Sequence, residues 1–321
     1  MIHANKPLVV LTGPTAVGKT ALSIALAKRI NGEIISADSV QVYRGMDIGS
    51  AKIKKEEMDG VPHHLIDIMD PKDAFNITLF QQYAREAIEK IYAKGRIPIL
   101  TGGTGFYIQS VLYDIDFTDN GENSEIRARL EMLAATEGAE ALHKRLMEID
   151  PEAAAAIHEN NIKRTIRALE FYELTGTRIS AHNQTQRANT SPYCFCYFVL
   201  NDDRDQVYAN IERRVDLMLE EGLVKEVSNL LQAGCTKEMV SMQALGYKEI
   251  AEALLGECTM EEAVYRIKRD TRHFAKRQLT WFRREKDVIW IDKKTYDYDS
   301  EKILDRMLTD MKERGVIKDQ C

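Results

Sequence analysis

Short apolar runs alternate with amphipathic stretches along the first hundred residues. Residues 8–11 are an apolar run, residues 33–36 (Glu-Ile-Ile-Ser) have the pattern of a second strand, and residues 19–30 between them carry aliphatic side chains at helical spacing. A strand, a helix and a strand within about 30 residues make a βαβ unit, whose handedness predicts a parallel sheet. An amphipathic stretch at 79–93 and an apolar run at 97–101 predict a further helix and strand. The predicted fold class is therefore α/β.

From about residue 116 the pattern becomes helical. After a loop-like segment at 119–123, helix-forming runs cover residues 124–137, 139–149, 151–157 and 162–175. No strand pattern returns until residues 194–200. An all-helical stretch between two strands predicts an insertion, residues 116–193, into an α/β core made of residues 1–115 and 194–321.

The last third of the chain combines a helical pattern with concentrated positive charge. Helices are predicted at 205–221 and 224–233, and a last strand at 288–291. No Gly or Pro interrupts residues 259–288, which predicts one long helix. Within it, residues 264–286 carry nine cations and two acids, a local charge of +7, whereas the whole chain carries −6. This segregation predicts one basic surface on an otherwise acidic protein.

A glycine-rich turn joins the first predicted strand to the first predicted helix. It matches the P-loop pattern G-x-x-x-x-G-K-[ST] with Gly13, Pro14, Thr15, Ala16, Val17, Gly18, Lys19 and Thr20. Such a turn directs backbone N–H groups at an anion, and the following helix N-terminus and Lys19 add positive charge. The Thr20 hydroxyl can ligate Mg²⁺. The turn therefore predicts a diphosphate or triphosphate site.

The acid expected beside this turn stands in an unusual place. P-loop enzymes usually hold Mg²⁺ through an Asp at the end of a second strand. Here the run at 97–101 continues into Gly-Gly-Thr-Gly, whereas the run at 33–36 is followed by Asp38. A carboxylate at the C-terminal end of a parallel strand lies in the usual ligand crevice. Asp38 is therefore a candidate for either a base or a metal ligand.

Longer motifs extend in order from Leu8 to about Ile291. Those that follow the P-loop include Asp38-Ser39-Val40-Gln41-Val42-Tyr43, Gly102-Gly103-Thr104-Gly105-Phe106-Tyr107, Lys163-Arg164-Thr165-Ile166-Arg167, Gly246-Tyr247-Lys248-Glu249 and Lys276-Arg277-Gln278-Leu279. Together they resemble the tRNA dimethylallyltransferases, also called tRNA isopentenyltransferases. The resemblance implies a P-loop NTPase-like parallel sheet flanked by helices. It also implies transfer of a dimethylallyl group from dimethylallyl diphosphate to the exocyclic amine of adenosine 37 in tRNA.

The resemblance also implies roles for single residues. Asp38 is expected to be the base that takes the amine proton, Thr104 to orient the adenine, and Arg214 to bind the leaving diphosphate. The residues expected to contact tRNA are Asp38, Ser39, Val40, Gln41, Thr104, Arg127, Lys163, Arg164, Arg167, Gln243, Gly246 and Tyr247.

The basic helix predicts a second tRNA contact. At 100° per residue, Arg269, Arg272 and Lys276 share one face, and apolar side chains take the broadly opposite face. We expect the cationic face, together with Arg277, to bind phosphates of the tRNA anticodon stem-loop.

Two other functions use some of the same features. A P-loop ATP-dependent small-molecule kinase needs the anion turn but has no use for a basic helix. A GTPase-like switch would need an Asn-Lys-x-Asp pattern for base recognition, and this sequence does not contain one. The longest apolar runs fall far short of the ~20 residues that span a bilayer. Five cysteines without Cys-x-x-Cys argue against a disulfide framework. The expectation is a monomeric, cytoplasmic, Mg²⁺-assisted transferase that binds no membrane.

Overall fold

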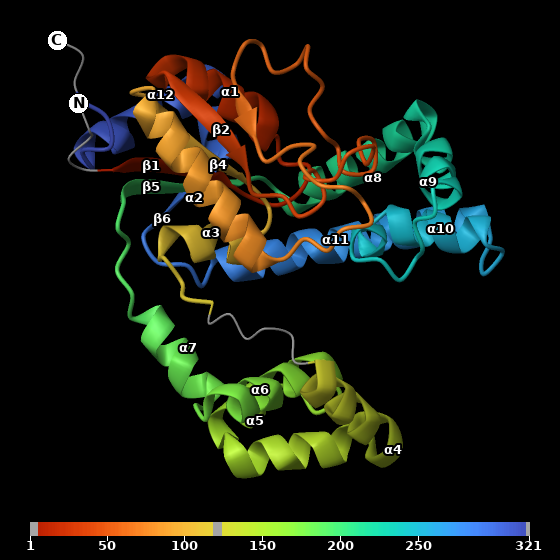
Figure 1. Ribbon diagram of the computed structural model, residues 1–321. Coiled ribbons are helices and arrows are strands. Elements are labelled where there is room, and N and C mark those ends of the chain that lie inside the picture. Colours follow the sequence, from red (N-terminus) through yellow and green to blue (C-terminus); the bar gives the residue numbers. More distant parts are fainter. Residues whose placement is uncertain (1–5, 118–123, 319–321) are drawn as a thin grey trace. The chain divides into compact units, whose positions relative to one another are not determined.

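The chain forms two compact units. The computed structural model of the protein describes residues 6–117 and 124–318, so the predicted loop at 119–123 lies outside the described residues. One unit comprises Met1–Leu112 and Pro192–Cys321, and the other comprises Tyr113–Ser191. These boundaries differ from the expected insertion, 116–193, by two or three residues at each end. Figure 1 labels the elements of both units.

A six-stranded parallel sheet forms the centre of the larger unit. Its strands are β1 (Pro7–Thr12), β2 (Gly32–Ser36), β3 (His63–His64), β4 (Ile97–Gly102), β5 (Cys194–Asn201) and β6 (Val288–Asp292), in the order β3-β2-β4-β1-β5-β6. In the register, Val9 of β1 lies opposite Ile99 of β4 and Cys196 of β5. The all-parallel sheet confirms the predicted fold class. The edge strand β3 was not predicted, because two residues carry no periodicity.

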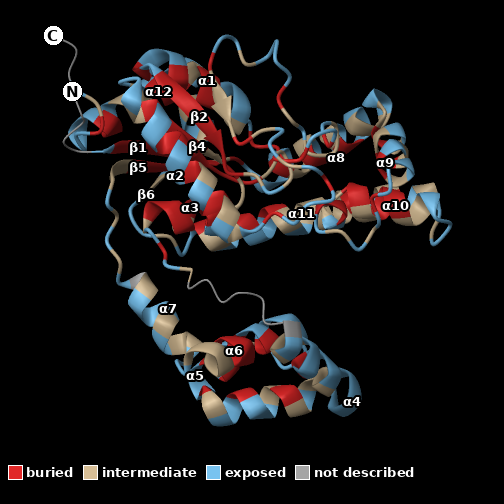
Figure 2. Cartoon of the chain, viewed as in Figure 1, coloured by how far each residue is buried: buried red, intermediate tan, exposed pale blue. Residues whose placement is uncertain are grey.

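Helices cover both faces of this sheet. They are α1 (Lys19–Ile30), α2 (Ile77–Ala93), α3 (Gly105–Leu112), α8 (Arg204–Glu221), α9 (Leu223–Gln232), α10 (Tyr247–Leu254), α11 (Met260–Phe282) and α12 (Ser300–Glu313). On one face Leu26 of α1 and Met307 of α12 pack with Val9 and Phe198 in one buried cluster. The connection from β1 through α1 to β2 and the connection from β3 through α2 to β4 run in opposite directions across the sheet. Because both connections are right-handed, α1 and α2 lie on opposite faces. Figure 2 shows that burial is concentrated on the strands.

Helix α11 is the single long helix that the sequence predicts. The Thr259 hydroxyl caps it by accepting a hydrogen bond from the Glu262 N–H at 3.1 Å. It packs on α8, α10 and α3, and it ends at Phe282. The last three cations of the basic segment therefore lie beyond the helix. Among the residues that the structure describes, every helix is too short or too polar to cross a bilayer.

The smaller unit is a helical domain with its own core. Its helices are α4 (Ser124–Ile149), α5 (Pro151–Ala156), α6 (Ile162–Thr175) and α7 (Ile179–Arg187). Leu130 and Leu142 of α4 pack with Ile166 and Leu169 of α6. Gly138 interrupts α4 with a φ of 87°, at the position where the pattern separates two helical runs. Only α7 was not predicted.

Candidate functional site

A cavity of about 500 Å³ lies in the larger unit at the carboxyl ends of the parallel strands. Its walls come from the P-loop turn after β1, the segments after β2 and β4, residues 243–246, and helices α8 and α11. Ligands of parallel α/β sheets bind at this edge. The predicted site residues that line the cavity are Thr15, Ala16, Gly18, Lys19, Thr20, Asp38, Ser39, Val40, Gln41, Thr104, Arg214, Gln243, Gly246 and Arg277.

Close packing shapes the P-loop turn. Gly13 has a φ of 150°, and a Cβ there would lie 2.3 Å from the Leu200 carbonyl oxygen of β5. Gly13, Pro14 and Val17 do not line the cavity, so of the eight predicted residues these three build the turn from behind. The Lys19 ammonium donates to the carbonyl oxygens of Gly13 at 3.0 Å and Pro14 at 2.8 Å. The lysine is therefore held over the loop that precedes it.

Three cations, Lys19, Arg214 and Arg277, and one carboxylate, Asp38, line the cavity. Burial, with a further contribution from the Arg214 guanidinium, lowers the pKa of Lys19 to about 7, although Asp38 acts in the opposite direction. Burial also lowers the pKa of Arg214. A bound diphosphate would favour the charged forms of Lys19 and Arg214. Arg213, the neighbour of Arg214 on α8, is exposed and lies outside the cavity.

A tight turn holds the Asp38 carboxylate at the end of β2. Its Oδ1 accepts hydrogen bonds from the N–H of Val40 at 2.8 Å and of Gln41 at 3.3 Å. Burial raises the pKa of Asp38, while these two hydrogen bonds and Lys19 oppose the rise. Among the described residues, no group donates a hydrogen bond to the other oxygen, Oδ2, which leaves it available to a proton donor.

The turn after β4 packs against the Asp38 turn. The Ala37 N–H donates to the Thr101 carbonyl at 2.7 Å, and the Thr104 N–H donates to the Ala37 carbonyl at 3.3 Å. A Cβ on Gly102 would lie 2.2 Å from the Ala37 oxygen, so a side chain would separate the two turns. The fold thus brings Thr104 and Asp38 together on one wall.

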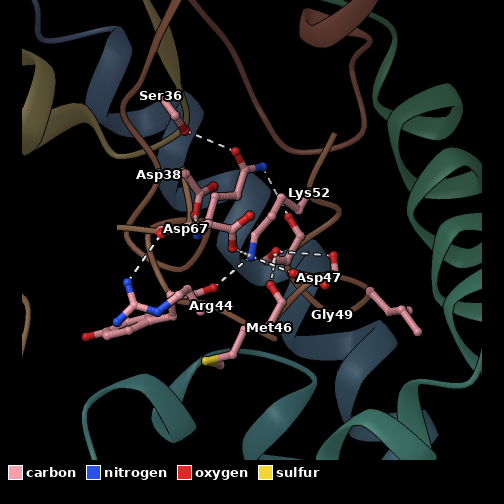
Figure 3. Close-up of polar contacts among 12 residues, drawn as sticks. Ser36, Asp38, Arg44, Met46, Asp47, Gly49, Lys52 and Asp67 are labelled. Carbon is pink, nitrogen blue, oxygen red and sulfur yellow. Dashed lines mark hydrogen bonds and ion pairs between the residues drawn. The ribbon is translucent and has the colours of Figure 1, made fainter. Parts of the chain in front are cut away.

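A buried lysine organises the long segment between β2 and β3. The Lys52 ammonium donates to the Tyr43 carbonyl at 2.7 Å and pairs with Asp47 at 2.6 Å and Asp67 at 2.5 Å (Figure 3). In the same segment the Ser36 hydroxyl donates to Gln41 Oε1 at 3.0 Å. The segment has almost no regular secondary structure, so these contacts give the residues after Asp38 their shape. Sequence reasoning missed Lys52, because one lysine in a polar segment carries no distinctive spacing.

Glu226 of α9 binds the backbone of the same segment. Its carboxylate accepts hydrogen bonds from the N–H groups of Asp47 at 3.0 Å, Ile48 at 2.8 Å and Gly49 at 3.2 Å, and from the Tyr247 hydroxyl at 2.6 Å. Tyr247 is fully buried, and a Cβ on Gly49 would lie 2.5 Å from its ring. The Tyr247 side chain therefore acts inside the protein and not, as expected, on an RNA surface. Sequence reasoning also missed Glu226, which sits in an ordinary amphipathic helix.

The cations of the basic segment fall into two groups. Four pair with carboxylates: Arg266 with Glu252, Lys268 with Asp216, Arg269 with Asp270, and Arg272 with Glu212, at 2.6–2.8 Å. Among the described residues, the remaining five are exposed and form no ion pair: Lys276, Arg277, Arg283, Arg284 and Lys286. The unneutralised charge is thus at the C-terminal end of the segment. The expected face running back to Arg269 and Arg272 is partly neutralised, because acids from neighbouring elements and from α11 itself face it.

The smaller unit carries the other predicted tRNA contacts. Arg127 of α4 and Arg167 of α6 both pair with the buried Glu170, at 3.0 Å and 3.4 Å. Lys163 and Arg164, in the first turn of α6, are exposed and form no ion pair with any described residue. The unit therefore offers two unneutralised cations and two that share one acid.

The turn after β1 lies at the carboxyl ends of the strands of a parallel sheet, which is the arrangement of P-loop proteins, a class that binds phosphorylated ligands. The IPP transferase family model matches residues 41–285. The tRNA dimethylallyltransferase of Lachnoclostridium phytofermentans is 61% identical and aligns over 98% of this chain and 100% of the relative. The full-length tRNA isopentenylpyrophosphate transferase of Bacillus halodurans, a crystal structure, is 46% identical, with a TM-score of 0.73 and coverage of 97% and 98%.

A third match is more distant in sequence. A eukaryotic dimethylallyltransferase captured crystallographically while acting on tRNA is 30% identical, with a TM-score of 0.76 over 89% of this chain and 73% of that chain. The chain belongs to the IPP transferase family. This membership confirms the expected enzyme class, a prenyl-group transferase, and it sets aside the small-molecule kinase and the GTPase-like switch.

Proposed function

We propose that the protein transfers a dimethylallyl group from dimethylallyl diphosphate to the exocyclic amine of adenosine 37 in tRNA. The observation that carries this proposal is that Lys19, Arg214 and Asp38 line one cavity. Cations suit a leaving diphosphate, and a carboxylate suits an amine that must lose a proton. The names of the relatives indicate the two substrates. The cavity offers cations for the diphosphate of one substrate and a carboxylate for the amine of the other.

The diphosphate is proposed to bind on the P-loop turn. As the allylic C–O bond breaks, its electron pair passes to the diphosphate oxygen, where negative charge grows. Lys19, Arg214 and the N-terminus of α1 stabilise that charge. Because both side chains already line the cavity before the reaction, little reorganisation is needed when the charge appears.

The adenine amine is proposed to attack the allylic carbon while Asp38 takes its proton. The nitrogen lone pair is delocalised into the ring, so loss of the proton as the C–N bond forms makes the amine a better nucleophile. Asp38 Oδ2 is the acceptor, since Oδ1 is held by two backbone N–H groups. Thr104, on the same wall, orients the base through its hydroxyl. Ser39, Val40, Gln41, Gln243 and Gly246 complete the wall around the adenosine.

The site residues fit a Mg²⁺ ion that is carried largely by the substrate. Among the described residues, no group of three or more His, Cys, Asp or Glu side chains could form a metal cage. Mg²⁺ in phosphate-transfer sites usually keeps several waters and binds substrate phosphates with few protein ligands. The Thr20 hydroxyl, which lines the cavity, would hold it, and Asp38 is the nearby carboxylate of the same wall. When bound, the ion would neutralise part of the diphosphate charge.

The proposal extends to the RNA and to the state of the enzyme. The exposed cations of the 276–286 segment and of α6 are proposed to contact phosphates of the anticodon stem-loop. The working unit is proposed to be a monomer. The four described cysteines are free thiols, which supports a reducing compartment such as the cytoplasm.

The experiment that tests the function maps the product on RNA. We expect purified protein, labelled dimethylallyl diphosphate and unmodified tRNA to give label at adenosine 37, located by nuclease digestion and mass spectrometry. A tRNA with guanosine at position 37 is the control and should remain unlabelled. Label at another position would overturn the choice of nucleotide, and absence of label with any tRNA would overturn the proposed reaction.

The basic segment predicts a change in salt dependence. Lys276→Ala should weaken tRNA binding and lower the slope of log K against log salt by about one, because one phosphate contact is lost. Arg272→Ala should have a smaller effect, since Glu212 already neutralises Arg272. Binding titrations at several salt concentrations measure both. Lys90→Ala, an exposed lysine of α2, is the control, and a Lys276→Ala slope equal to its slope would contradict the contact.

A further inference from the structure

We propose that Gln278 is a positioning residue that sets the spacing between two turns; this inference rests on the proposed function. The first is the P-loop turn after β1, on which the diphosphate is proposed to bind, and the second is the turn after β4, which carries Thr104 and is called the adenine turn below. Gln278 stands on α11, and its side chain is buried. Its Oε1 accepts a hydrogen bond from the Thr15 N–H at 2.9 Å. Its Nε2 donates to the Gly103 carbonyl oxygen at 2.9 Å. One side-chain amide therefore bridges the turn after β1 and the turn after β4.

The partners determine the orientation of this amide. A backbone N–H can only donate and a carbonyl oxygen can only accept, so Oε1 must face Thr15 and Nε2 must face Gly103. A Cβ on Gly103 would lie 2.2 Å from Nε2, and a Cβ on Gly105 would lie 2.3 Å from the Trp281 ring. Two glycines of the adenine turn thus allow α11 to approach closely, and there is no room for a side chain between this turn and Gln278.

The bridge has two consequences for the reaction. The Thr15 backbone N–H donates to Gln278 and therefore cannot donate to an anion on the P-loop turn. Gln278 thus helps to determine which backbone N–H groups of the turn are left for the anion. Gly103 precedes Thr104, so the same side chain also sets the position of the hydroxyl that orients the adenine. The pairing of β1 with β4 ends at Thr12 and Gly102, and beyond those residues the Gln278 amide links the two turns that are proposed to hold the leaving group and the nucleophile. A displacement of about 1 Å between reacting groups can cost about 100-fold in rate.

A matched pair of buried glutamines tests the inference. Gln81 of α2 is also buried, and its Nε2 donates to the Ser110 carbonyl at 2.7 Å, but it lies outside the cavity. Gln278→Met and Gln81→Met remove the same chemical group and keep an unbranched side chain of similar length. With both substrates saturating, we expect Gln278→Met to lower the single-turnover rate about 10- to 100-fold and leave tRNA affinity unchanged. Gln81→Met should leave the rate unchanged, with a comparable loss of melting temperature.

Equal rates in the two variants at equal melting temperature would overturn the positioning role. If Gln278→Met does not fold, Gln278→Glu is the alternative, since it still accepts from Thr15 but has no proton for Gly103 when ionised. Its rate should also fall, and a wild-type rate would overturn the inference. A failure of the proposed function looks different: the wild-type protein itself would then transfer no label to any tRNA, whatever the Gln278 variants do.

Discussion

Replacing Asp38 by Asn is expected to lower the rate of prenyl transfer by about 100- to 10,000-fold, the usual contribution of a general base. The amide oxygen can still accept hydrogen bonds from the N–H groups of Val40 and Gln41, so the turn keeps its shape. What is lost is the carboxylate that is proposed to receive the amine proton. Single-turnover assays with labelled dimethylallyl diphosphate measure the rate, and equilibrium binding should give an unchanged affinity for tRNA.

The wild-type pH profile should report the same group. Asp38 acts as a base only when it is ionised, so the rate falls as the pH is lowered through its pKa. Burial raises that pKa, so the fall begins at a higher pH than it would for an ordinary Asp. Asp59→Asn, which changes an exposed carboxylate of the same segment outside the cavity, is the control and should keep both rate and profile. An Asp38→Asn rate within about tenfold of wild type would contradict the base role.

Replacing Arg214 by Gln is expected to have the second large effect, a loss of about 100- to 1,000-fold in the rate of transfer, with weaker binding of dimethylallyl diphosphate. The guanidinium is proposed to face the leaving group together with Lys19, and its burial makes its charge act in a medium that screens it little. Arg214→Lys should recover part of the rate, because it restores the charge but not the planar pair of donors.

The neighbouring arginine provides the control for this prediction. Arg213→Gln removes the same charge one position earlier on α8, from an exposed side chain outside the cavity. Its rate and its affinity for the diphosphate should match the wild type. Equal losses in the two variants would mean that the helix needs positive charge in general, and the role of Arg214 in the site would be rejected.

Local patterns predicted most of the elements around the site, and non-local contacts explain what they missed. The P-loop and α1 were predictable because the turn, the helix and their glycines are contiguous in sequence. Helix α12 was not predicted, and the short strand β3 was missed because two residues carry no periodicity. Arg272 was expected to be an unpaired cation because a helical wheel shows only the residues of one helix and not the acids of neighbouring helices. Its partner Glu212 lies 60 residues away on α8.

The same limit applies to the residues that hold the site. Gln278 stood within a recognisable motif, but its partners, Thr15 and Gly103, lie 263 and 175 residues away. Glu226 reaches Asp47, Ile48 and Gly49 across a similar gap, 177–179 residues. Such contacts have no periodicity or spacing in the chain, so pattern analysis cannot find them.

The order of residues alone determined the anion turn, the acid after β2, the parallel sheet and the helical insertion, because each depends on contiguous side chains or short-range periodicity. Tertiary structure decided that Asp38, Lys19 and Arg214 share one cavity, that Tyr247 is a buried hydrogen-bond donor, and which cations of the basic segment stay unneutralised. These outcomes depend on burial and on pairing between distant segments, and both are set only when the elements pack.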